Sequence, residues 1–451
     1  MRPPCRRDLT VLMLLLAGWL LPALSTARPS ELRRIVLPDG ATLILKPEMT
    51  SDLVAISICI RTEPDRSPVD DAAGEMVARS LFSSSLNRSR ESISVSLSQV
   101  GGSVETLRTA EHVNITCVAL PSQIREAIYL LCEVLKNADF GALEHARTEV
   151  IAEQQRAAPE FYSGLDLLRR ALHARADLSE LPFKSITHAQ AAAYFRAKYV
   201  PEHTAIAVVG QFDVQSVQTA LRDSLADFDR HGARPLRAEP LFSHATNFPT
   251  RTLSRPGTSG YALVATAAPA LTEMDTPAFL VLKSILGEGH ASRLFQRLRD
   301  AQGIGYSVGA LWQPSLSDPL TAYVQWEARP PSATGTAQPA GNGAPNQKSL
   351  SASEALHLLT VQLDGLLSDP PTEAEVGRAR KVALGRETLR HERAKDRAFL
   401  LAWYEAMGVG ADFDAELPRR LAGVTRDDVL RVARTYLTPR ASVLIVPRPS
   451  E

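Results

Sequence analysis

Hydrophobic and polar residues alternate along the chain in two ways. Short apolar runs bounded by turn residues are typical of strands, whereas apolar residues that recur every three or four positions are typical of amphipathic helices. The first half predicts paired strands within 31–47, a strand at 53–61, a helix near 71, strands within 100–120, helices at 122–136, 141–156 and 188–199, and a strand at 204–209. The second half predicts strands at 261–267, 304–310 and 321–328, and helices at 277–286 and 292–301.

The same order of elements occurs twice. A helix that begins after Thr187 leads into an apolar strand, and a helix that begins after Thr425 does the same. The helix at 141–156 has its counterpart at 372–390. Self-similarity at a period near half the chain length indicates a duplicated domain. We therefore predict an α+β fold of two homologous halves, each a mostly antiparallel sheet with long helices packed on one side.

Composition divides the chain further. Arginines precede an apolar stretch at 11–24, and small residues follow it at 25–27, so residues 1–27 are expected to be a signal peptide. The halves are then 28–229 and 250–451, joined by a Pro- and Arg-rich linker at 230–249. Residues 329–351 are rich in breakers and polar residues, and are expected to be a disordered insertion in the second half. An exported protein, periplasmic or extracellular, is the expected product.

Charge and cysteine content exclude some classes of function. The chain has 50 basic and 50 acidic residues and a formal net charge of zero, so we expect no nucleic-acid binding. After the predicted signal peptide, Cys59, Cys117 and Cys132 remain. Their spacing fits neither a disulfide framework nor a thiolate zinc site. Buried thiols are the preferred interpretation, and a single disulfide is the alternative.

Several segments resemble one known family. They are Gly101-Gly102 before a strand, Val150–Glu153 within a long helix, and above all the segment 292–307, which contains Ser292-Arg293-Leu294-Phe295 and ends in Gly305-Tyr306-Ser307. Together with the two halves, they resemble the pitrilysin/insulinase-type zinc peptidases, in particular the mitochondrial processing peptidase and its bacterial relatives. The resemblance implies that the two halves form a clamshell.

The catalytic motif of that family is missing here. Active members carry His-x-x-Glu-His on the first helix of the N-terminal half, where two imidazoles bind zinc and the Glu polarises water. The corresponding segment runs from Glu75 to Arg79, with Ala78 in place of the general base. The family's third ligand corresponds to Glu153. The resemblance therefore implies a non-catalytic member that binds no metal.

The replacement suggests a specific contact. Glu75 and Arg79 are four residues apart on a helix, in the favourable orientation for an ion pair. A guanidinium stays protonated and cannot bind a cation. We expect Arg79 to bridge Glu75 and Glu153 where zinc would lie; the alternative is an ordinary solvated Glu153.

A second site is implied by the resemblance. Active assemblies use an Arg, and a Tyr seven positions later, to hold the substrate peptide, and Arg299 and Tyr306 match that spacing. The alternative is a surface Arg and a half-buried core Tyr. Arg293 and Arg297 lie on the same predicted helix and are expected to form a solvated basic face.

A degenerate zinc site beside an intact Arg–Tyr pair implies division of labour. The resemblance then implies a non-catalytic subunit of a heterodimeric exported zinc peptidase. A separate zinc-bearing subunit of the same family would be its partner, zinc would be expected only in that partner, and a peptide or unfolded polypeptide would be the substrate. Two alternatives remain: a structural or assembly subunit like the core subunits of the cytochrome bc complex, and a peptide-binding homodimer without proteolysis.

Overall fold

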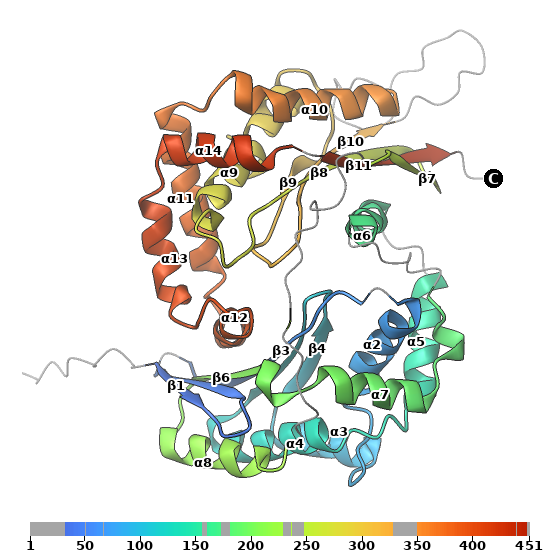
Figure 1. Ribbon diagram of the computed structural model, residues 1–451, viewed down its shortest axis with the longest axis vertical. Helices are drawn as coiled ribbons and strands as arrows, with labels where there is room; N and C mark the ends of the chain where they lie inside the picture. The colour runs from blue at the N-terminus through green and yellow to red at the C-terminus, as the bar shows by residue number, and fades with distance from the viewer. Residues whose placement is uncertain are drawn as a thin grey trace, which may run out of the picture.

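The computed structural model describes residues 32–49, 51–65, 67–155, 160–172, 181–228, 236, 248–327, 350–438 and 440–448. They form two sheets with their helices, one above the other in Figure 1. The predicted signal peptide lies outside the described residues, as do nearly all of the predicted linker and insertion. The predicted α+β fold of two halves is confirmed.

The first half is built on a six-stranded sheet in the spatial order β1-β2-β6-β3-β5-β4. Its strands are β1 (Arg33–Val36), β2 (Thr42–Pro47), β3 (Val54–Arg61), β4 (Ser103–Arg108), β5 (His112–Ala119) and β6 (Thr204–Gly210). Its helices are α2 (Pro68–Ser80), α3 (Arg90–Gln99), α4 (Ile124–Lys136), α5 (Leu143–Gln155), α6 (Glu160–Leu172), α7 (His188–Lys198) and α8 (Val214–Leu225). The central strands β3 and β6 are buried along almost their whole length, as their mainly apolar sequences predict.

The second half is built on a five-stranded sheet in the order β7-β11-β8-β10-β9. Its strands are β7 (Arg251–Pro256), β8 (Ser259–Thr266), β9 (Val308–Leu311), β10 (Leu320–Glu327) and β11 (Arg440–Arg448). Its helices are α9 (Thr276–Gly287), α10 (Ala352–Ser368), α11 (Glu373–Leu389), α12 (Ala394–Ala406), α13 (Phe413–Ala422) and α14 (Arg426–Tyr436), with a π-helical turn at Phe295–Asp300.

The duplication is visible in the sheet topology. Apart from β1, the two strand orders correspond, and the last strand of each half pairs in parallel with the first strand of the matching set, β6 with β2 and β11 with β7. The helices that precede these last strands, α7 and α14, begin with the same capping box, formed by Thr187 with Gln190 and by Thr425 with Asp428. The shared cap explains why both helices could be found from sequence.

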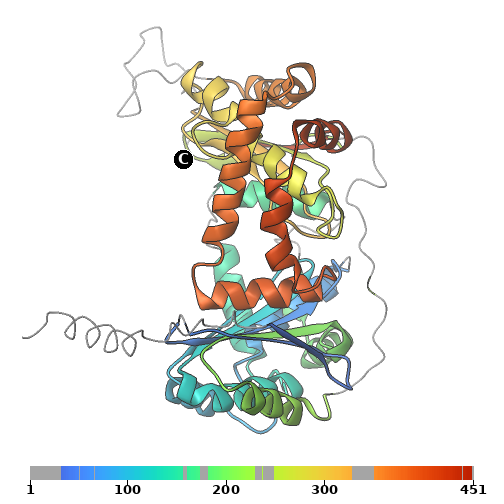
Figure 2. The ribbon, with the colours of Figure 1, turned by 90° about the vertical axis from the view of Figure 1, so that its left-hand side faces the viewer.

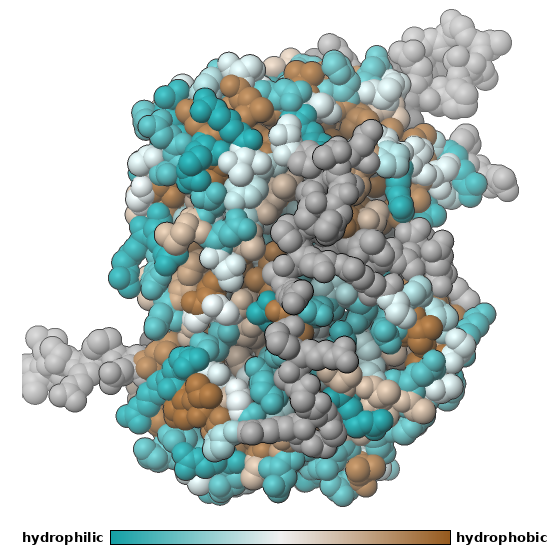
Figure 3. Space-filling model, viewed as in Figure 1, coloured by the Kyte–Doolittle hydropathy of each residue, from teal (hydrophilic) through white to brown (hydrophobic). Residues whose placement is uncertain are grey.

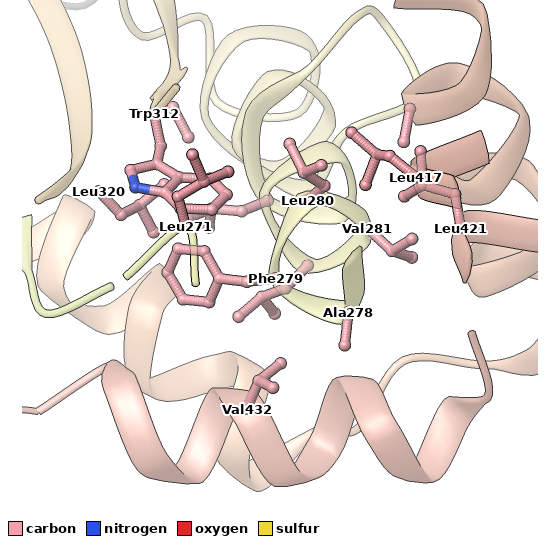
Figure 4. Packing of buried hydrophobic residues seen from close by; sticks show 14 of the residues in the cluster. Leu271, Ala278, Phe279, Leu280, Val281, Trp312, Leu320, Leu417, Leu421 and Val432 are labelled. Atoms are coloured by element: carbon pink, nitrogen blue, oxygen red, sulfur yellow. The ribbon is translucent and has the colours of Figure 1, made fainter. Parts of the chain in front are cut away.

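Apolar helix faces fill the core of the second half. Figure 4 shows Phe279 of α9 against Trp312, with Leu271 and Leu320 beside them and Val432 of α14 below. The Phe279 and Trp312 rings meet edge to face, with centroids 4.8 Å apart, which is a favoured aromatic geometry. On the uncovered part of the face in Figure 3, hydrophobic residues occur in small groups among polar ones.

Each half sends one helix onto the sheet of the other. Helix α12 of the second half packs against β3 and β6 of the first, and Figure 2 shows it lying along that sheet. Helix α6 of the first half packs against β8 and β11 of the second. A Cβ at Gly164 of α6 would lie 2.5 Å from Cδ1 of Ile445, so a larger residue there would displace the Ile445 side chain. Helices α12 and α6 therefore connect the two halves through packing contacts.

The three cysteines in the described ranges are free and buried, as the preferred interpretation predicted. Burial raises the pKa of Cys117 to about 11 and that of Cys132 to about 12, which makes both thiols poor nucleophiles. Among the described helices, none has the length and apolar character needed to cross a membrane.

Candidate functional site

The segment Glu75–Arg79 on α2, called the zinc turn below, corresponds to the zinc motif of the family. The Arg79 guanidinium in this turn contacts two carboxylates. Ser67 caps the helix, which carries Glu75 and Arg79 one turn apart. Nε of Arg79 donates to Oε1 of Glu75 at 2.7 Å, and Nη2 lies 2.6 Å from Oε2 of Glu153 on α5. Both contacts predicted for Arg79 are therefore present.

The electrostatics of this turn oppose cation binding. Burial disfavours the charge on Arg79, yet Glu75 and Glu153 outweigh that cost and raise its pKa above the ordinary value. Ala78, at 6% exposure, puts a buried methyl group where a general base would be needed. In the ranges that the structure describes, no cluster of three or more His, Cys, Asp or Glu residues could hold a metal ion. A fixed positive charge thus stands between the carboxylates.

A buried ion network extends from this turn, and sequence reasoning missed it. Nη2 of Arg108 on β4 lies 2.8 Å from Asp65 and 3.0 Å from Asp71. Its Nη1 lies 3.7 Å from Glu75. Burial opposes its charge, but Tyr194 and the carboxylates raise the pKa of Arg108 above its ordinary value. Buried charges with several partners are tolerated because each lost water contact is replaced.

The network also reaches α6. Nη1 of Arg170 lies 2.8 Å from Asp71, and its Nε donates to Asp166 at 2.9 Å. Since α6 packs on the second sheet, Asp71 links the first turn of α2 to the helix that joins the halves. The Asp166–Arg170 pair has i,i+4 spacing on one helix, whereas Asp71 and Arg170 are 99 residues apart and nothing in the local pattern marks their contact.

A cavity of about 340 Å³ lies beside the network, between the halves. Residues of both halves line it, including Glu75 and Arg108 from the first and Phe399 and Trp403 of α12 from the second. His112 of β5 also lines it and is only 8% exposed. Burial lowers the pKa of His112 to about 4, so the folded protein holds this ring neutral.

We expect acid to weaken the fold through His112. In the unfolded chain the ring titrates near 6.5, so the unfolded state takes up the proton first as pH falls. Its contribution to stability is complete above about pH 6.5 and is lost between there and pH 4. Going from pH 7 to pH 5 should lower the free energy of unfolding by about 2 kcal/mol through this residue.

Urea unfolding of the wild type and of His112→Gln at pH 7 and pH 5 measures the contribution of His112 to the free energy of unfolding. The variant should show a pH-dependent loss that is smaller by about 2 kcal/mol. His391→Gln is the control of opposite sign, because Asp414 raises the pKa of His391 and stabilises the fold at low pH. Equal pH dependence in the wild type and His112→Gln would contradict the assignment.

The Arg299–Tyr306 pair is also present. The Arg299 guanidinium lies over the Tyr306 ring, 5.0 Å from its centroid. The predicted strand at 304–310 is wrong in its first part, since β9 begins only at Val308. Gly303 and Gly305 both have positive φ, which breaks the strand and leaves Tyr306 in a bend, 67% exposed. No contact joins this pair to the Arg79 bridge within the described part of the chain.

The neighbouring arginines behave differently from Arg299. Arg293 is buried and makes a bidentate contact with Glu375, at 2.8 and 3.1 Å. Arg297 lies 2.5 Å from Asp369. The predicted solvated face is therefore wrong for Arg293, whose role is to join this segment to α11. Arg299 has no hydrogen bond or ion pair with any residue in the described ranges, so its N–H groups are available to a ligand.

Comparison with known proteins supports the resemblance seen in the sequence. The family model described as the peptidase M16 inactive domain matches residues 185–382. Residues 185–382 therefore match an M16 peptidase domain, and the predicted resemblance to that family is confirmed. This is the pitrilysin/insulinase-type family that its motifs resemble. An uncharacterized zinc protease of Streptomyces coelicolor is 25% identical to this chain over 441 residues, covering 92% of the chain and 89% of the relative.

Solved structures show the same M16 fold. A protease from Helicobacter pylori has a TM-score of 0.76 at 16% identity and covers 93% of this chain and 100% of its own. A peptidase M16 inactive domain from Pseudomonas fluorescens has a TM-score of 0.75, with the same identity and coverage. With Arg79 in the zinc turn, the chain is an inactive M16 peptidase-like protein.

Proposed function

We propose that this chain is the non-catalytic subunit of an exported, heterodimeric M16 zinc peptidase. It binds an extended peptide or unfolded polypeptide through Arg299 and Tyr306 and presents it to a separate zinc-bearing subunit. The observation that carries the proposal is the contrast between the two sites. The zinc turn is occupied by an internal cation, whereas the Arg299 guanidinium has no carboxylate partner in the described ranges.

The zinc turn supports the non-catalytic part. Hydrolysis by this family's mechanism needs a metal-bound water and a base beside it. Arg79 contacts the carboxylates of Glu75 and Glu153, and Ala78 has no proton acceptor. The two sequence-distant carboxylates are therefore engaged in holding the turn together instead of binding metal.

The Arg–Tyr pair supports the peptide-binding part. A guanidinium presents several N–H donors in one plane, which suits the carbonyl oxygens of an extended peptide. The exposed Tyr306 ring lies directly beneath it and adds a hydroxyl. An arginine with a purely structural role would be expected to pair internally, as Arg293 does.

Capture of the partner tests the proposal. The tagged chain, expressed with residues 1–27 intact in its native host, should be recovered from the exported fraction with an M16 protein that carries His-x-x-Glu-His. The chain alone should bind an extended peptide but not cleave it; the reconstituted pair should cleave it, and a chelator should stop cleavage. Chelator-sensitive cleavage by the lone chain would refute the proposal, and recovery in a membrane complex without a peptidase would favour an assembly role.

A further inference from the structure

Arg299 lies against two aromatic rings. Its guanidinium carbon is 4.7 Å from the centroid of Phe295 and 5.0 Å from that of Tyr306. Both distances lie within the range of cation–π attraction. The cation is therefore held by ring faces, which leave its N–H groups free, instead of by a carboxylate, which would occupy them.

The backbone is shaped to bring these groups together. Residues Phe295–Asp300 form a π-helical turn, in which the Ala301 N–H donates to the Gln296 carbonyl at 2.9 Å. Such turns are uncommon and occur frequently at functional sites. The chain then reverses through Gly303 and Gly305 and places Tyr306 on the guanidinium. A Cβ at Gly305 would lie 2.4 Å from the Gln325 carbonyl oxygen, so this reversal requires glycine.

We propose that Phe295 is a positioning residue for the peptide-binding pair Arg299 and Tyr306. The face of the Phe295 ring fixes the Arg299 side chain before the peptide binds. This inference rests on the proposed function, because it concerns how the same pair binds peptide. An unpaired arginine has many rotamers, and fixing one in advance lowers the entropic cost of binding. Phe295 thus raises peptide affinity without touching the peptide.

Fluorination of the ring tests the proposal directly. Fluorine withdraws electron density from the ring face with little change of shape, so it weakens a cation–π contact but hardly affects packing. We would replace Phe295 with mono-, di- and trifluorinated phenylalanine and measure binding of a fluorescein-labelled peptide of alternating Ala and Thr by anisotropy. Affinity should fall stepwise, by about threefold at the trifluorinated ring, whereas Phe295→Leu should lose about fivefold.

Phe413 supplies the matched control, because Arg420 lies 5.4 Å from its centroid in a different cation–π pair of the same half. Fluorination there should leave peptide affinity unchanged. A flat series at Phe295, while Arg299→Ala still weakens binding, would overturn the positioning role and leave the proposed function standing. No peptide binding by the wild type, or equal binding by Arg299→Ala, would refute the proposed function itself.

Discussion

Arg299→Ala should weaken peptide binding by this chain, and cleavage by the reconstituted pair, by about 10- to 100-fold. The physical reason is the loss of charge-assisted hydrogen bonds, each worth about 1.5–3 kcal/mol. Tyr306→Phe removes only the hydroxyl and should cost less, about 2- to 10-fold. Titration with the labelled peptide measures the change in affinity, and the initial rate of cleavage by the two reconstituted subunits measures the change in activity.

Arg297→Ala is the matched control for that experiment. Arg297 lies on the same turn, but it pairs with Asp369, an exposed carboxylate. Exposed ion pairs contribute little, so affinity should change by less than about threefold. Equal losses at Arg297 and Arg299 would show that general positive charge, and not the aromatic-bound cation, attracts the peptide.

Asp71→Ala should destabilise the fold by about 3–5 kcal/mol, the cost of removing one partner from a buried ion pair. Asp71 lies against both Arg108 and Arg170, and its loss leaves two buried guanidinium groups with fewer counterions. Because Arg170 belongs to α6, the change should also loosen the contact between the halves. Thermal and urea unfolding measure the first effect, and amide hydrogen exchange along α6 measures the second.

Asp70→Ala provides the comparison at the adjacent position. Asp70 is an exposed acid in the same first turn of α2, so its loss should cost only about 0.3–1 kcal/mol through the helix dipole. A similar loss at both positions would mean that the network around Asp71 adds nothing beyond the helix terminus.

Local patterns carried the prediction of most elements. The mainly apolar run of β3 and the capping boxes of α7 and α14 can be predicted from neighbouring residues, because periodicity and caps are local properties. The predicted strand is wrong at Ile304, because alternation of apolar residues does not account for the glycines on either side. Gly303 and Gly305 both adopt positive φ, and the Gly-Ile-Gly triplet could have indicated a turn.

Long-range contacts were predictable only where the family resemblance paired the residues. It placed Glu153 opposite Arg79, and the structure joins them. The Asp71–Arg170 pair had no such support, because 99 residues separate the two side chains and neither has a local signature. In the same way, the apolar stripe of α6 shows that the helix is covered, but not that the sheet of the other half covers it.

We expect Arg79 to exclude a metal ion from the α2 turn, and elemental analysis of the purified chain measures this exclusion. The chain would be purified without chelator, dialysed against buffer with zinc in small excess, desalted and analysed by mass spectrometry for metals. The triple variant Glu75→His, Ala78→Glu, Arg79→His, which restores the motif beside Glu153, would be treated in parallel as a positive control. The wild-type chain should retain far less than one zinc ion per chain. One tightly held zinc ion per wild-type chain that is lost in Glu153→Gln would show that Arg79 does not exclude metal.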